Sequence, residues 1–276
     1  MKKKGYYILF IPCVVLVAYF MIVPLIGTIL PTFTNTTDGM FSAYTSFFKD
    51  EYMMSIFIRT IKISLLSSII CMFVGVPVAY FISRTSKKLR GLFIALTVFP
   101  ILTNSVVRSF AWMSILGKNG VINSLLMKLN LISEPLSLLY TEGAIIIGTV
   151  YIFLPLMIIS LVGVMENVEN DLLEAAESLG ANKLKAFFKV IFPLSLPGLI
   201  VGTVLVFTGS LTAYTTPQLL GGNKNTVLAT LIYQKTMTLG DWQGAAVVAT
   251  IMIVVTLIVI KGINFLASRL DKRGVS

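Results

Sequence analysis

The most constraining feature of the sequence is a series of long apolar runs, each close to the length that a helix needs to cross a bilayer. Roughly 20 apolar residues span the hydrocarbon core as a helix, because a helix satisfies its own backbone hydrogen bonds. The runs lie at about residues 6–30, 61–83, 91–116, 143–165, 198–219 and 244–266. We therefore expect an all-α membrane protein of six transmembrane helices, with residues 1–276 forming a single transmembrane domain.

Composition supports a polytopic membrane protein and argues against a soluble domain. The sequence is 56% hydrophobic and only 12% charged, far from the balance of soluble domains. The net charge of +10 therefore reflects cationic loops that orient the protein in the membrane, and we expect no nucleic-acid partner. Cys13 and Cys71 lie in separate apolar runs without metal-ligand spacing, and histidine is absent, so we expect no metal site and no cofactor.

The distribution of lysine and arginine predicts how the runs are oriented. Clusters of cations fall on one side of the predicted bundle: Lys2–Lys4, then Arg84, Lys87, Lys88 and Arg90, then Lys183, Lys185 and Lys189, and finally Lys261, Arg269, Lys272 and Arg273. Loops on the other side carry only scattered cations. The positive-inside rule therefore places both termini, and residues 166–197, in the cytoplasm of a bacterial cell, with the protein in its inner or plasma membrane. The first run is interpreted as an uncleaved span, and residues 31–60 as an outer loop that carries a surface helix.

Residues 171–198 form the one long charged segment between two apolar runs. Leu172, Ala175, Ala176 and Leu179 recur at helical spacing, Gly180 breaks that helix, and a second amphipathic helix follows. In the second helix Leu184, Phe187, Phe188 and Ile191 share a face, and Asn182 is placed to cap it. The pattern predicts a helix-turn-helix that lies flat on the membrane surface. An interfacial loop that merely links two spans is the alternative.

The order of residues in this segment resembles the EAA loop of ABC importer permeases. It reads Glu174-Ala175-Ala176, three residues, Gly180, nine residues, then Val190-Ile191-Phe192-Pro193. The family has Ile and then Leu-Pro where this chain has Val190 and Phe192-Pro193, a mild departure. The resemblance implies a coupling helix that docks on a cytoplasmic ATPase. The coupling residues that it implies are Glu174, Ala175, Ala176, Glu177, Leu179 and Gly180.

The sequence contains no recognisable catalytic apparatus. A G-x-x-x-x-G-K-[ST] phosphate-binding loop is absent, and so are a carboxylate pair and a nucleophile-base arrangement. We expect no enzymatic activity in this chain, so that energy for any transport comes from separate ATPase subunits.

Polar and aromatic residues inside three of the runs predict a translocation path, because burying polar groups in lipid is costly. Asn104, Arg108 and Trp112 recur every four residues, after a kink expected at Pro100. The predicted path residues are Asn104, Arg108, Trp112, Tyr151, Phe207, Ser210 and Tyr214, with Phe207, Ser210 and Tyr214 sharing a face with Thr203.

Other roles remain open for these residues. Ser and Thr hydroxyls can bond their own helix, and Trp112 and Tyr214 can belong to an interfacial belt. Arg108 either lines the path or reaches towards the outer surface. Gly198 and Gly202 are expected to permit close helix packing.

A wider resemblance, to spermidine/putrescine ABC permeases, covers nearly the whole chain. It is carried by Phe99-Pro100, Thr103-Asn104-Ser105, Arg108 with Trp112, Leu116-Gly117, Gly120 to Asn123, Tyr214 to Asn225, and Asp241-Trp242 with Gly244 to Ala246. It is nearest to the first of the two permease subunits of such systems. It implies a type I importer fold in the lipid membrane, a second homologous permease subunit, two cytoplasmic ATPase subunits and an extracytoplasmic substrate-binding protein.

The substrate implied by the resemblance is a polyamine. Arg108 would repel a polycation, and no acidic residue lies inside a predicted span. Importers for opines, aminophosphonates and amino-acid-like anions share these motifs, which keeps an anionic substrate as the alternative. A membrane scaffold or receptor that docks an ATPase without transport is the second alternative, although buried polar faces favour transport.

Overall fold

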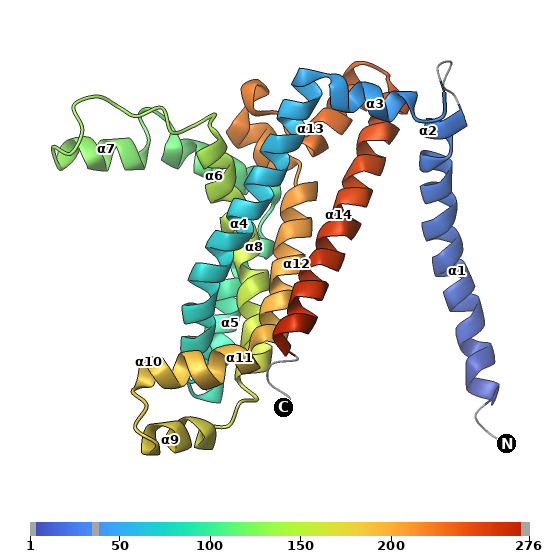
Figure 1. Ribbon diagram of the computed structural model, residues 1–276. Helices are drawn as coiled ribbons and strands as arrows, with labels where there is room; N and C mark the ends of the chain where they lie inside the picture. The colour runs from blue at the N-terminus through green and yellow to red at the C-terminus, as the bar shows by residue number, and fades with distance from the viewer. Residues whose placement is uncertain (1–3, 35–38, 272–276) are drawn as a thin grey trace. The chain divides into compact units, whose positions relative to one another are not determined.

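The computed structural model describes residues 4–34 and 39–271, and these residues are helical with no strand among them (Figure 1). Seven longer α-helices organise the described residues: α1 Lys4–Ile29, α4 Glu51–Ser83, α5 Lys87–Leu102, α6 Ser105–Leu116, α8 Glu142–Met165, α12 Leu196–Thr212 and α14 Trp242–Asp271. Shorter α-helices are α2 Pro31–Thr34, α3 Ser42–Lys49, α7 Val121–Lys128, α9 Asp171–Ser178, α10 Lys183–Ala186, α11 Phe192–Leu194 and α13 Leu228–Tyr233. The π-helices η1 Phe187–Ile191, η2 Pro217–Gly221 and η4 Gln234–Thr238, with the 3-10 turn η3 Asn223–Asn225, complete the described elements.

The chain forms two compact units. One contains the described residues up to Ser55 together with Leu231–Ile253, and the other contains Ile56–Thr230 and the residues from Val254 on. The second unit holds α5, α6, α8, α9 and α12, which carry most of the candidate functional residues.

Long apolar helices account for the six predicted spans. Four helices are long and apolar enough to cross a membrane, and two further pairs of helices could each form one bent span, which gives up to six. The bent pairs are Lys87–Leu102 with Ser105–Lys128, at 93°, and Lys183–Leu194 with Leu196–Thr212, at 67°. The all-α prediction is confirmed, and two of the spans are broken.

The third predicted span, residues 91–116, was expected to bend at Pro100, and the bend lies instead after Leu102. The chain breaks at Thr103 and Asn104, and the axis turns by 93°. Asn104 starts α6 by accepting hydrogen bonds from the backbone N–H groups of Val106 and Val107 at 2.9 and 3.4 Å. Pro100, the expected kink, lies inside α5. The capping amide, and not the proline, therefore marks the break.

Two other predicted boundaries also differ. The span expected from residue 61 begins at Glu51, because Asp50 caps α4 by accepting hydrogen bonds from the N–H groups of Tyr52 and Met53 at 2.8 and 3.0 Å. Among the described residues of the expected 31–60 loop, the short helices α2 and α3 precede α4. The span expected to reach residue 219 ends at Thr212, where Ala213 turns to extended backbone.

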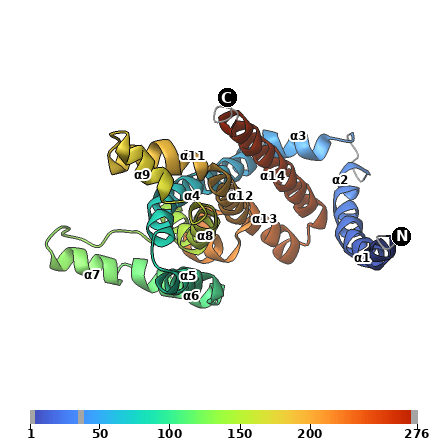
Figure 2. The same ribbon diagram turned by 90° about the horizontal axis from the view of Figure 1, so that it is seen from below.

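The core of the larger unit is built around α8, which α12 and α4 approach closely (Figure 2). A Cβ added at Gly198 would lie 2.6 Å from the Ser160 carbonyl oxygen, and one at Gly202 would lie 2.6 Å from the Met157 sulfur. On the α4 side, a Cβ at Gly75 would lie 2.7 Å from Met157 Cγ. The expectation that Gly198 and Gly202 permit close packing is confirmed, since larger residues would separate the helices.

We predict that Gly198→Ala destabilises the fold while Gly163→Ala does not. Gly198 faces backbone atoms of α8, whereas a Cβ at Gly163 would meet nothing within 4 Å. Overpacking of this kind costs about 1–3 kcal/mol, and alanine in an exposed helix is favoured over glycine by up to about 1 kcal/mol. Thermal unfolding of the two variants in the same lipid nanodiscs measures the difference. Equal midpoints would contradict the packing role of Gly198.

Candidate functional site

A pocket of about 270 Å³ lies between α6 and α8, where the third span is broken. It is lined by Thr103, Val107, Arg108, Ala111, Trp112, Ile115 and Tyr151. The rings of Trp112 and Tyr151 meet edge to face, with centroids 5.5 Å apart and an interplanar angle of 77°. Of the seven predicted path residues, the pocket brings three together: Arg108, Trp112 and Tyr151.

Arg108 is engaged with the backbone and only 7% exposed. Its Nη1 donates hydrogen bonds to the carbonyl oxygens of Pro100 at 2.7 Å and Thr103 at 3.2 Å, and it lies 3.3 Å from Thr103 Oγ1. Carbonyls at the end of a helix lack an intrahelical partner. Arg108 therefore gives a hydrogen-bond donor to carbonyls that the break in the span leaves without one from the helix. The arginine therefore lines the pocket but also clamps the end of α5.

The other predicted path residues do not line this pocket. Asn104 precedes α6 as its cap, so it does not share a helix face with Arg108 and Trp112 as predicted. Phe207 and Ser210 are buried on α12, and Tyr214 follows the end of that helix, so the predicted face of Phe207, Ser210 and Tyr214 is interrupted. Their place in a translocation path stays a prediction.

The segment from α9 to α11 has the predicted helix-turn-helix form. Gly180 adopts φ +85°, a left-handed conformation that ends α9. Asn182 caps α10 by accepting a hydrogen bond from Lys185 N at 2.8 Å. The second helix differs from the prediction, because after α10 it continues as the π-helix η1 and runs through Pro193 into α11.

Helix α9 leaves most of its predicted coupling residues exposed. Glu174, Ala175, Glu177, Leu179 and Gly180 are exposed, and Leu179 reaches 89%. Ala176 is half-buried, and Leu173 packs against the core of the unit.

Cations near the ends of α4 and α5 hold this segment. Arg84 Nη1 donates to the Val168 carbonyl at 2.9 Å and to Asn170 Oδ1 at 2.6 Å. Arg90 forms an ion pair with Glu166 at 2.6 Å. Residues that sequence analysis used only to orient the spans therefore also attach the base of α9 to the bundle.

Comparison with known proteins agrees with this architecture. Residues 39–273 match the family described as "Binding-protein-dependent transport system inner membrane component". The chain belongs to this family. It is therefore a permease component of an ABC importer.

Individual relatives cover most of the permease. It is 32% identical to the spermidine/putrescine transport system permease protein PotB of Haemophilus influenzae, over 93% of this chain and 92% of that one. Identity to PotB of Escherichia coli K12 is 34%, over 82% of each chain. A solved bacterial alginate ABC transporter, in complex with an alginate-bound periplasmic protein, matches with a TM-score of 0.81 at 18% identity, over 98% of this chain and 96% of that one. This structural likeness shows the type I importer permease fold.

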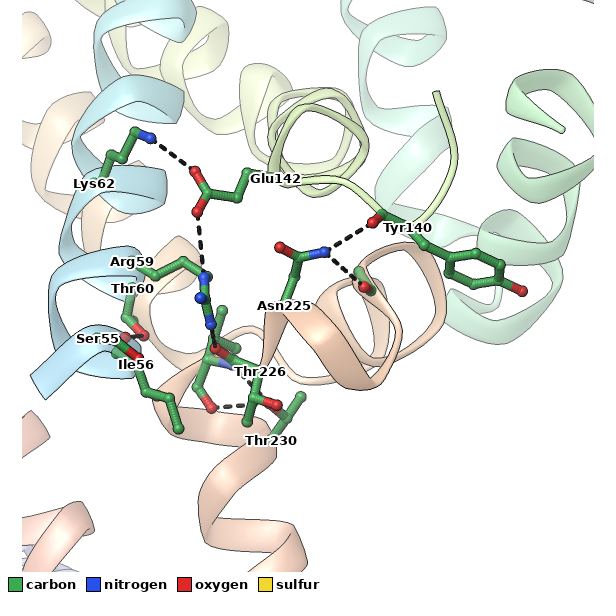
Figure 3. A network of polar contacts seen from close by, with 12 residues as sticks. Ser55, Ile56, Arg59, Thr60, Lys62, Tyr140, Glu142, Asn225, Thr226 and Thr230 are labelled. Carbon is green, nitrogen blue, oxygen red and sulfur yellow. Dashed lines mark hydrogen bonds and ion pairs between the residues drawn. The ribbon is translucent and has the colours of Figure 1, made fainter. Parts of the chain in front are cut away.

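A polar network at the opposite end of α4 and α8 was missed by sequence analysis (Figure 3). Glu142 accepts hydrogen bonds from Arg59 Nε at 3.2 Å and Lys62 Nζ at 2.8 Å. Arg59 Nη1 also donates to the Thr226 carbonyl at 3.0 Å, and Leu228 N donates to Thr60 Oγ1 at 3.0 Å. These contacts join α4, α8 and the 226–228 segment of the permease. The spacing of Arg59 and Lys62, one helical turn apart, was the available signal.

The smaller unit of the permease contains a further charge pair. Lys235 Nζ lies 2.8 Å from Asp241 Oδ2, and Gly244 N donates to Asp241 Oδ1 at 2.7 Å, which caps α14. The hydrogen bond from Lys235, followed by that from Gly244 N, lowers the pKa of Asp241 despite opposition from partial burial. The acid therefore stays ionised at neutral pH and secures the start of α14.

We predict that Arg108→Ala destabilises the permease by about 1–3 kcal/mol, because the Thr103 carbonyl loses the donor Arg108 and the Pro100 carbonyl keeps only Thr103 Oγ1. Arg108→Lys should recover part of this loss, since an ammonium can reach fewer acceptors. Thermal unfolding in nanodiscs measures both variants without any substrate. Wild-type stability in Arg108→Ala, combined with lost uptake, would instead make the guanidinium a substrate contact.

Proposed function

We propose that this permease carries a polyamine across the inner membrane as one half of the transmembrane path of an ATP-driven importer. It would pair with a second homologous permease, rest on two cytoplasmic ATPase subunits, and receive substrate from an extracytoplasmic binding protein. The spermidine/putrescine permeases of Haemophilus and Escherichia, aligned over most of their length, support the substrate class. The alginate transporter described with its periplasmic protein supports this kind of assembly.

The observation that carries the substrate proposal is the identity to the spermidine/putrescine permeases over most of the chain, and the pocket at the α5–α6 break offers aromatic rings that fit it. The wall of this pocket includes the half-buried Trp112 and Tyr151 rings, and aromatic faces attract alkylammonium groups. Arg108 carries a charge that would repel a polycation, and its guanidinium donates hydrogen bonds to backbone carbonyls. No acidic side chain is among the residues that line the pocket. Carboxylates for a polycation would then come from the second permease.

We further propose that α9 couples the permease to the ATPase from the cytoplasmic side. Its exposed Leu179, Ala175 and Glu174 offer a docking surface, and Gly180 gives the sharp turn behind it. Both termini would lie on the same side, as the cation clusters indicate. Of those cations, Lys2, Lys3, Lys272 and Arg273 lie outside the described residues, whereas Arg84, Arg90 and Lys183 lie within them.

We predict that Glu174→Lys uncouples ATP hydrolysis from uptake while the permease still assembles in the membrane. The change reverses a charge on the proposed docking face without touching the core, because Glu174 is exposed. Glu169→Lys, an exposed acid just before α9, is the matched control. Uptake into proteoliposomes and ATPase activity are measured together. Wild-type uptake in Glu174→Lys would contradict the coupling role of α9.

The substrate class is tested by ATPase activity of the reconstituted importer with its cognate binding protein. We expect stimulation by spermidine or putrescine and none by anionic amino-acid derivatives. Loss of a cation–π contact is worth about 0.5–2 kcal/mol, so Trp112→Ala should raise the half-maximal polyamine concentration about 2- to 30-fold. Trp112→Phe should retain more affinity, and Trp242→Ala, which alters the other tryptophan and lies outside the pocket, should leave it unchanged.

The outcomes separate the possible functions. Stimulation only by an anion would assign Arg108 to substrate recognition and overturn the polyamine proposal. If no solute stimulates the ATPase activity of a complex that still hydrolyses ATP, the result would favour a scaffold that docks an ATPase without transport.

A further inference from the structure

A second cavity lies on the surface of the larger unit, between α4 and the segment that follows α9. This groove has a volume of about 580 Å³, within the usual range for small-molecule sites. Met72, Phe73 and Val76 line it from α4, and Leu184 and Phe188 line it from α10 and η1. Lys183 is the one charged side chain among its lining residues. The groove is separate from the pocket at Trp112 and Tyr151, with which it shares no residue.

The groove lies where a membrane span meets the membrane surface. Helix α4 is long and apolar enough to span a bilayer, and its groove residues come from the turns before its end at Ser83. Phe73 is 70% exposed and Phe188 is 62% exposed. Aromatic side chains exposed at this depth contact acyl chains, because water is excluded there. An exposed apolar groove on a candidate span is therefore suited to an acyl chain.

Charge at the mouth of the groove selects among lipids. Lys183, Lys185 and Lys189 are all exposed on α10 and η1, and no acidic side chain is among the residues lining the groove. Each basic residue near a membrane surface is worth about 1 kcal/mol towards anionic headgroups. A cation beside an apolar slot complements an anionic phospholipid better than a zwitterionic one.

The local backbone shapes the groove. Phe187–Ile191 form a π-helix, a rare geometry that often marks a functional site. It places the Phe187 ring edge-on to Tyr80 of α4, with centroids 4.9 Å apart, and the Phe188 ring 5.2 Å from that of Phe187. The aromatic rings thus join η1 to α4 on one side of the groove, while Phe188 remains exposed.

We propose that an anionic phospholipid binds in this groove, with an acyl chain along Phe73, Val76 and Phe188 and its phosphate at Lys183. The bound lipid fills the space between a span and the segment that continues from α9. Binding does not depend on the transported solute or on coupling by α9. Failure of the lipid proposal is therefore distinguishable from failure of the proposed transport function.

The test measures lipid retention by native mass spectrometry. The importer, purified with its partner subunits, is extracted from vesicles with equal phosphatidylglycerol and phosphatidylcholine. We expect the wild type to retain phosphatidylglycerol preferentially, and Lys183→Gln to reduce that preference about fivefold, the equivalent of one lysine at a membrane surface. Lys128→Gln removes an exposed lysine from α7, away from the groove, and should leave the preference unchanged.

A second variant tests the apolar part of the groove. Val76→Trp fills the slot and should lower retention of both lipids, whereas Leu92→Trp adds the same bulk at an exposed position of α5 outside the groove and should not. Equal retention of the two lipids by the wild type, or an unchanged preference in Lys183→Gln, would overturn the proposal. High-yield cross-linking of Phe188→Cys to the second permease subunit would also overturn it, since protein would then cover the groove.

Discussion

The permease depends on one constraint, which is that backbone polar groups inside a bilayer must find partners within the protein. Continuous helices such as α4 and α8 meet it automatically. The break at Thr103–Asn104 does not, because it strands carbonyls at the end of α5 and N–H groups at the start of α6. Asn104 accepts from the N–H groups, and Arg108 donates to the carbonyls. One amide and one guanidinium thus permit a 93° turn that opens a pocket at Trp112.

A second constraint is that helices in lipid have no hydrophobic driving force to associate. Close packing around α8 provides the attraction instead. Gly198 and Gly202 bring α12 against Met157 and Ser160, and Gly75 brings α4 against Met157 from its own side. Contacts of this kind gain dispersion energy only at short range, so the absence of a Cβ matters more than hydrophobicity. The charged network of Glu142 with Arg59 and Lys62 then joins the start of α8 to the N-terminal third of α4.

The sequence predicted features that depend on local composition and missed those that depend on distant partners. Hydropathy located the four long apolar helices and the two bent pairs, and Gly180 with Asn182 correctly predicted the turn and the cap after α9. The break in the third span was assigned to Pro100 because proline is the usual cause of a kink, although a proline can remain within a helix. The partners of Arg108, up to eight residues back in the chain, could not be inferred from helical spacing. The residues of η1, Phe187–Ile191, contain no sequence pattern that predicts a π-helix.

Arg84 and Arg90 belong to the cation clusters used to predict the orientation of the spans, and they also attach the segment before α9 to the bundle. Helix α9 buries little apart from Leu173, so it depends on its connections. Arg84 holds the approach to α9 through Val168 and Asn170, and Arg90 holds Glu166, which links it to the ends of α4 and α5. On its other side the chain continues through α10, η1 and α11 to α12. The segment at α9 is therefore connected to the bundle in two directions, one to α4 and α5 and one to α12. Since α5 ends at the Arg108 clamp, the first connection leads directly to the pocket at the break.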